Sequence, residues 1–188
     1  MRLHRVLAPA SDATSVGPRV TLERGPDVYE RARTAQQAAA LVRLLGPEAL
    51  GGVLQAALPA LLAGAADASP AVRRQALWAL HHLATRAPPE ELRWQRALLT
   101  DVARRALIGC DAAAWPAAAP AACALAVALD GRDVWGPAME AVLCEMLLQG
   151  EMHVRDPERR VIWLDAAPCL LQAMGLAQRG RARPRTRA

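Results

Sequence analysis

The histidines and paired carboxylates are the residues of this chain that could bind a metal ion or transfer a proton. The four histidines are scattered, and none stands in the HExxH spacing that places two imidazoles on one face of a helix. His81 and His82 are adjacent, so on a helix their side chains point in different directions and do not converge on a metal ion. Glu90 and Glu91 lie at a predicted helix start, where acidic groups stabilise the helix dipole. We predict neither a metal site nor an acid–base pair.

The four cysteines do not form the pattern of a zinc site or a disulfide framework. No two of them have CxxC spacing, and their neighbours are apolar, as in LIGCD and APCLL. We predict buried, reduced thiols, which favour the cytoplasm and/or the nucleus, and organelle targeting by the arginine-containing amino terminus is an open alternative. The chain also lacks a glycine-rich phosphate loop and a nucleophile elbow. We therefore expect a protein that is not an enzyme and has no cofactor or small-molecule substrate.

Composition predicts helices throughout. The chain has 43 alanines and no phenylalanine, and arginine supplies all 23 basic residues. Alanine, leucine and arginine favour helix, and β-branched residues are few, so we predict an all-α fold. The net charge of +5 is concentrated at the carboxyl terminus, because residues 27–175 contain 14 arginines and 16 acidic residues. The predicted folded body is therefore not basic.

One uncharged segment has almost the length of a membrane span. Residues 112–129 read AAAWPAAAPAACALAVAL, which is 18 residues without a charge. Most of them are alanine, which gains little from lipid, and Pro116 and Pro120 interrupt the pattern. We interpret this segment as a helix that is packed on both sides inside a stack of helices, and we predict no membrane contact.

The positions of proline, glycine and polar residues divide the chain into three parts. Residues 1–26 are predicted to be irregular and disordered, 27–175 to form the helical domain, and 176–188 to be an arginine-rich disordered tail. Ser69 and Pro70 are expected to be the cap and the first residue of a helix. Seven helices are predicted over residues 27–45, 48–63, 70–86, 90–108, 112–129, 137–149 and 156–174.

Prolines at helix starts recur at regular intervals. Pro70, Pro116 and Pro157 each begin the second helix of a predicted pair, and they are 46 and then 41 residues apart. Two helices in a repeat of this length indicate an α-solenoid of HEAT or armadillo type. We predict about three helix pairs plus an amino-terminal helix. Neighbouring pairs must stack, because a single pair cannot bury its apolar surface.

Arg73 lies within the apolar arc of the helix predicted over 70–86, and a buried guanidinium needs an acidic partner. Together with Pro59, Asp67 and Val72, it resembles the HEAT pattern of a proline in the first helix, a turn aspartate and a Val-Arg early in the second. In that family the arginine reaches turn acids of its own or adjacent repeats. The resemblance implies that Asp67 and Arg73 form the structural pair of this repeat, with Asp111 as the acceptor one repeat on.

The tryptophans are candidates for either the core or an interface. Trp78 lies near Arg74 and His82 on a helical wheel, away from the main apolar arc, and we predict that these three residues contact a protein partner. The alternative is that Trp78 contacts the next repeat. Trp94, Trp115, Trp135 and Trp163 are candidates for the core of a chain that has no phenylalanine, and we favour this interpretation for Trp163 in VIWL.

The arginine-rich tail has two interpretations. It carries five arginines between residues 179 and 187 without an interleaved aromatic residue to stack on bases. The first interpretation is a solvated tail that binds no nucleic acid. The alternative is a nucleic-acid-associated helical-repeat protein that binds through this basic tail.

Three segments resemble the carboxy-terminal region of the Tel-two-interacting protein two family, the smallest subunit of the TTT complex. They read SPAVRRQALWALHHL, EELRWQRALLTDVARRALIGCDAAAWPAAAPAACALAVALDGRD and VIWLDAAPCLLQAMGL. The resemblance covers residues 47–176 and is strongest over 69–133 and 164–176. It implies a non-catalytic scaffold or cochaperone subunit. Its implied partners are the other TTT subunits and phosphatidylinositol-3-kinase-related kinases, together with the ninety-kilodalton heat-shock chaperone. Family members are longer, and residues 1–26 match nothing in them.

Overall fold

The computed structural model describes residues 27–108, 111–131 and 135–175, and this part of the chain contains helices and no strand. The predictions for residues 1–26 and 176–188 lie outside the described residues. The all-α prediction is confirmed within them. The helices are α1 (Val28–Leu44), α2 (Pro47–Ala65), α3 (Pro70–Arg86), α4 (Pro89–Arg93), α5 (Arg96–Ile108), α6 (Trp115–Asp130), α7 (Pro137–Met152) and α8 (Pro157–Ala173).

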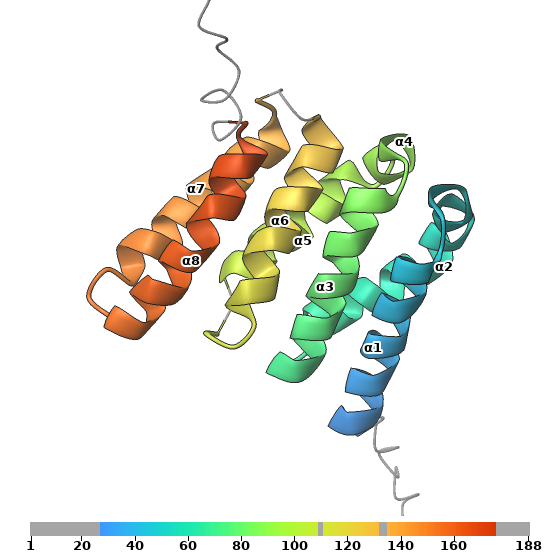
Figure 1. Ribbon diagram of the computed structural model, residues 1–188, viewed down its shortest axis with the longest axis horizontal. Helices are drawn as coiled ribbons and strands as arrows, with labels where there is room; N and C mark the ends of the chain where they lie inside the picture. Colours follow the sequence, from blue (N-terminus) through green and yellow to red (C-terminus); the bar gives the residue numbers. More distant parts are fainter. Residues whose placement is uncertain (1–26, 109–110, 132–134, 176–188) are drawn as a thin grey trace, which may run out of the picture.

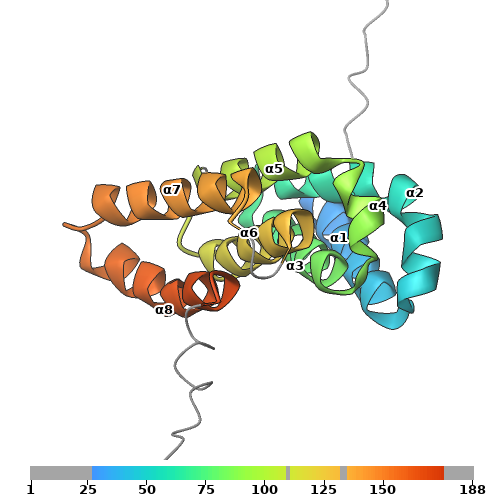
Figure 2. The same ribbon diagram turned by 90° about the horizontal axis from the view of Figure 1, so that it is seen from above.

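The helices form two rows. Helices α1, α3, α6 and α8 lie side by side in the first row and begin at the same end, at the bottom of Figure 1. Helices α2, α5 and α7 form the second row behind them, as the view from above in Figure 2 shows. Along the first row α3 packs on α1, α6 on α3 and α8 on α6. Helices α1 and α2 therefore occupy one end of the array, and α7 and α8 the other.

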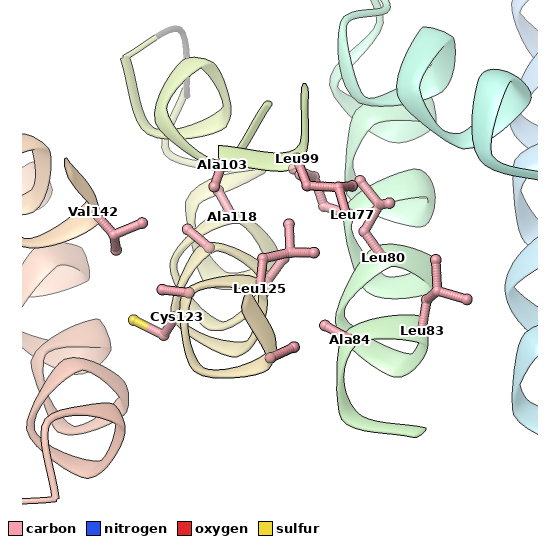
Figure 3. Packing of buried hydrophobic residues seen from close by; sticks show 14 of the residues in the cluster. Leu77, Leu80, Leu83, Ala84, Leu99, Ala103, Ala118, Cys123, Leu125 and Val142 are labelled. Carbon is pink, nitrogen blue, oxygen red and sulfur yellow. The ribbon is translucent and has the colours of Figure 1, made fainter. Parts of the chain in front are cut away.

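The core is centred on α6, whose alanines allow neighbouring helices to approach closely. This helix contacts α3, α4, α5, α7 and α8, so the apolar segment over 112–129 is a packed helix, as predicted. In Figure 3, Leu80 and Ala84 of α3 face Leu125 of α6, and Ala103 of α5 lies above Ala118. Alanines on both helices bring α5 close to α6, while leucines from both helices fill the space between α3 and α6.

Six of the eight described helices have a proline in the first turn, where no backbone N–H is lost from the hydrogen-bond ladder. Ser69 occupies the predicted cap position, but the predicted capping hydrogen bond from its side chain is absent. Its backbone N–H instead donates to the Asp67 carboxylate at 2.8 Å, so the aspartate supplies the acceptor at this helix start.

The helix predicted over 90–108 is interrupted, which raises the count in the described residues from seven to eight. It ends at Arg93 and begins again at Arg96, and the N–H of Gln95 donates to the carbonyl of Leu92 in the intervening turn. Helix α4 buries Leu92 against the core, whereas α5 continues along the second row and buries Leu99. No glycine or proline marks this break, so the sequence carried no local signal for it.

Among the described residues, α2 is the one helix whose length and apolar character would also permit it to cross a membrane. In its most apolar 18-residue window 28% of the residues are buried. Core helices of soluble proteins meet the same two criteria.

Candidate interaction surface

Successive helices of the first row are joined by an arginine of one helix and an aspartate in the turn before the next. Arg31 of α1 donates from Nε to Oδ2 of Asp67 at 2.8 Å, while Oδ1 of Asp67 accepts the N–H of Ser69. Nη2 of Arg31 also donates to Oδ1 at 3.4 Å, so Arg31 binds both carboxylate oxygens and Oδ1 holds the turn as well. These hydrogen bonds and the charge of Arg31 lower the pKa of Asp67. We call this arrangement the Arg–Asp clamp.

The same clamp recurs between α3 and α6. Arg73 donates from Nη2 to Oδ2 of Asp111, and Oδ1 of Asp111 accepts the N–H of Ala114 at 2.9 Å. Arg31 and Arg73 are each the fourth residue of their helix, which explains why both reach the next turn. Two adjacent junctions of the first row are thus built in the same way.

The structure corrects the pairing predicted for Asp67 and Arg73. Their contact runs through the backbone: Nη1 of Arg73 donates to the carbonyl oxygens of Asp67 at 2.7 Å and Ala68 at 2.9 Å. The carboxylate of Asp67 is bound by Arg31 instead. Arg73 pairs with Asp111, which was the acceptor expected one repeat on. Because Arg73 lies in the first turn of α3, its side chain contacts both the turn before α3 and the neighbouring turn that contains Asp111.

A related contact connects α5, α6 and α7. Nη1 of Arg96 donates to Oδ1 of Asp130, the last residue of α6, at 3.0 Å, and Oδ2 accepts the N–H of Met139 in the first turn of α7 at 2.7 Å. Asp130 is buried, and these partners occupy both of its carboxylate oxygens.

The junction between α6 and α8 has no such clamp. The fourth residue of α6 is the buried Ala118, and Asp156 in the following turn accepts the N–H groups of Glu158 and Arg159 of its own helix. Tryptophans take the place of the ion pair: Trp115 and Trp163 line a narrow pocket here together with Asp111, Ala112, His153, Arg159 and Ile162. Nε1 of Trp163 donates to the carbonyl of Met146 at 2.7 Å, whereas Nε1 of Trp115 is buried and has no hydrogen-bond partner among the described residues.

A groove crosses the carboxyl-terminal halves of α3, α6 and α8. Its floor is a half-buried stripe of α6 formed by Pro120, Ala124 and Val127, and its walls include His81 of α3 and Gln172 of α8. The remaining lining residues are Ala84, Thr85, Ala87, Pro89, Arg93, Cys123, Ala128, Gly131, Cys169 and Ala173. We call this the α6 groove. A floor of small apolar residues with polar groups on its rim suits a helix or an extended segment of another polypeptide.

The thiols beside the α6 groove are not activated nucleophiles. Burial raises the pKa of Cys123 to about 12, with a further contribution from the nearby Cys169, and burial also raises the pKa of Cys169. Both thiols are therefore protonated at neutral pH. The prediction of burial holds for Cys123 but is wrong for Cys144, which is exposed. Cys110 lies outside the described residues.

Arg74, Trp78 and His82 lie along one side of α3. Arg74 is exposed, but Trp78 is half-buried and packs against the core, because α1 and α6 flank α3 in the row. The ring of Trp78 stacks on His82, with centroids 6.3 Å apart, and meets His81 edge to face at 5.6 Å. Burial, followed by the charges of His81, Arg43 and Arg86, lowers the pKa of His82. Of the adjacent histidines, only His81 lines the α6 groove.

For Trp94 and Trp135, the interpretation as core residues is wrong. Trp94 is 86% exposed and Trp135 is 55% exposed, whereas Trp115 is buried and Trp163 half-buried as expected. Trp94 is exposed because it lies at the break between α4 and α5. Sequence periodicity assumed an unbroken helix there, and therefore missed the most exposed tryptophan of the described chain.

No group of three metal-binding side chains converges within the described ranges. No protein-family model matches the chain, and no curated protein matches it. The surfaces described above are therefore interpreted from their own chemistry.

Proposed function

We propose that this chain is an α-solenoid of HEAT or armadillo type that acts as a non-catalytic scaffold for other polypeptides. The recurrence of the Arg–Asp clamp at two successive junctions of the first row carries this proposal. Arg31 and Arg73 occupy the same place in their helices and use the same atoms of an aspartate in the next turn. A repeated junction is what a stack of equivalent units requires.

The α6 groove is the surface through which the scaffold binds a polypeptide. It spans three consecutive helices of the first row, so a ligand lying in it contacts several repeats at once. Its apolar floor supplies burial, while His81 and Gln172 on the rim offer hydrogen bonds to a backbone. Proteins built from stacked helix pairs commonly bind along such extended surfaces.

The biological role that we propose follows the sequence resemblance to the smallest TTT subunit. In that role the chain docks on the larger scaffold subunit and supports the maturation and stability of phosphatidylinositol-3-kinase-related kinases with the ninety-kilodalton heat-shock chaperone. The resemblance rests on residues 69–133 and 164–176, whereas the clamp rests on the side-chain geometry of Arg31, Asp67, Arg73 and Asp111.

Co-purification tests this role directly. The full chain, co-expressed with the two larger TTT subunits, is expected to recover both of them, and recovery of neither would end the proposed role. Val127→Glu, which places a charge on the floor of the α6 groove, should reduce recovery at least about tenfold. Leu98→Glu is the matched control, since Leu98 is exposed on α5 in the second row. Equal recovery by both variants would exclude the α6 groove while leaving the scaffold role standing.

A further inference from the structure

The two ends of the helical array each carry one half of an Arg–Asp clamp. At the α1 end, Oδ1 of Asp27 accepts the N–H of Val28 at 2.7 Å, just as Asp67 and Asp111 hold their own turns. No described residue occupies the other oxygen of Asp27. At the α8 end, Arg160 is the fourth residue of its helix, as Arg31 and Arg73 are of theirs. Its side chain is exposed and has no partner among the described residues.

These two half-clamps are complementary. Within the array, the acid before a first-row helix binds the arginine of the preceding helix. No described helix precedes Asp27, and no described turn follows α8 beside Arg160. The nearby Asp156 does not replace that turn, because it caps α8 and faces Arg159. The missing partner of each end is thus present at the other end of the same chain.

Exposed apolar side chains accompany both half-clamps. On α8, Val161, Leu164 and Leu171 recur along the side opposite Ala166 and Leu170, which are buried. Helix α7 adds a second exposed stripe consisting of Leu147, Leu148 and Met152. The other end exposes Tyr29, Leu41 and Leu44 on α1, and Val53 on α2. Figures 1 and 2 both place these helices at opposite ends of the array.

The chain beyond α8 does not offer a suitable cover for this surface. Residues 176–188 contain a single large aliphatic residue, Leu176, together with five arginines. Such a segment supplies little apolar area and would add positive charge beside Arg160. A second copy supplies both an apolar face and a carboxylate.

We propose that copies of this protein associate head to tail, with α7 and α8 of one copy packed on α1 and α2 of the next. Arg160 of one copy binds Asp27 of the next, which continues the first-row clamp across the interface. Helices α1 and α8 run in the same direction in the first row, so α8 can meet the next α1 as α1 meets α3. The two surfaces differ, so the contact does not close on itself, and assemblies lengthen as the concentration rises.

Sedimentation velocity of the full chain over a range of concentrations tests the proposal. The wild-type mass is expected to rise with concentration, and Arg160→Glu and Asp27→Arg should each weaken association at least about tenfold. Arg104→Glu, a charge reversal on an exposed residue of α5 in the middle of the array, should leave association unchanged. A wild-type protein that stays monomeric at every concentration would overturn the proposal.

Mixing the two charge variants separates this interface from any other. Alone, each variant places like charges at every junction, but in the mixture every junction joins opposite charges. Arg160 of the Asp27→Arg protein meets Asp27 of the Arg160→Glu protein, and the introduced glutamate meets the introduced arginine, so mixing should restore association. Leu164→Glu serves as a second end variant because it leaves the cap of α1 intact, and circular dichroism should confirm that each variant folds. Assembly that persists in both Arg160→Glu and Leu164→Glu would assign it to another surface.

Discussion

Helix α6 has a different kind of junction on each of its two sides in the first row. On the α3 side, the guanidinium of Arg73 binds Asp111 in the turn before α6, whereas on the α8 side the indole of Trp163 lies beside Trp115 of α6. Both junctions join helices of the same row that run in the same direction. At the α3–α6 junction the partly buried guanidinium of Arg73 binds a turn carboxylate and two carbonyl oxygens, while its Nε is buried without a partner among the described residues. The α6–α8 junction relies on alanines and two tryptophans, and Trp163 also donates to the carbonyl of Met146 on α7.

The charged α3–α6 junction and the aromatic α6–α8 junction should respond differently to amino-acid substitution. The Arg–Asp clamp is directional, so it determines the register between helices, but losing one partner leaves the other stranded. The aromatic junction depends on shape, so it tolerates a polar change but responds to added volume. Variants at the two junctions should therefore fail for different reasons.

Removing the guanidinium at the clamped junction should have the largest effect. Arg73→Ala is expected to lower the free energy of unfolding by about 2–4 kcal/mol, because it strands Asp111 and two backbone carbonyls. Chemical denaturation measures the change. Arg74→Ala is the matched control, because the Arg74 side chain is exposed. This variant should change the free energy of unfolding by less than about 0.5 kcal/mol. Equal stability of both variants would show that the clamp contributes nothing.

Adding one carbon at the α7–α8 contact should have the next largest effect. A Cβ at Gly150 would lie 2.7 Å from Cε2 of Trp163, whose ring is held by its hydrogen bond to Met146. Gly150→Ala is therefore expected to destabilise the protein by about 1–2 kcal/mol despite the higher helix propensity of alanine. Thermal unfolding measures the change.

Gly52→Ala is the control for the effect of helix propensity. Gly52 also lies within a helix, but nothing is within 4 Å of the added Cβ, so this variant should gain about 0.5–1 kcal/mol. A gain of the same size in Gly150→Ala would show that Trp163 moves aside without cost.

Acid should weaken the clamped region through Asp67. Its pKa is lowered in the folded protein from the ordinary value of 3.8, so the unfolded chain binds more protons in acid. The stabilisation is fully present above about pH 4 and is lost as the pH falls through the folded pKa. Asp67→Asn should cost about 1 kcal/mol at pH 7, since the ion pair with Arg31 is partly exposed, and this difference should shrink in acid.

Denaturation curves recorded between pH 7 and pH 3 measure this dependence. Asp27→Asn is a useful comparison, because Asp27 caps its helix without a bound arginine among the described residues. At a low protein concentration its difference from wild type should depend less on pH than that of Asp67→Asn. Parallel pH profiles for the two variants would contradict a role for Arg31.

The smallest effect is expected at Trp115. Its indole N–H is buried without a partner in the described part of the chain, so Trp115→Phe removes an unsatisfied donor as well as some apolar area. These changes oppose each other, and the net change in stability should be below about 1 kcal/mol. A loss larger than about 2 kcal/mol in denaturation experiments would show that this N–H has a partner in solution.

Local chemistry made most of the helices predictable. Alanine and leucine runs, prolines at first turns and turn aspartates determined where α1, α3 and α8 begin and end to within about two residues. The interruption at Trp94 was not predictable in this way, because the preference for turning α4 against α6 comes from burying Leu92 in the assembled core.

The candidate interaction surface was predicted in part. Wheel periodicity put Arg74, Trp78 and His82 on one side of α3, but it did not show that α1 and α6 flank this helix and half-bury Trp78. The α6 groove combines side chains from four helices, so no segment of the sequence contains its pattern.

What the sequence determined by itself was the all-α class, the helix positions and the need of Arg73 for an acidic partner, since propensity, capping and the cost of a buried charge are local properties. Only the tertiary structure decided that Arg73 binds Asp111 while Arg31 takes Asp67, and that Trp94 faces solvent. The sequence offered more than one acidic partner for Arg73, namely Asp67 and Asp111. Which of them is near in space depends on how the two rows pack, because an ion pair forms only where folding brings its charges together.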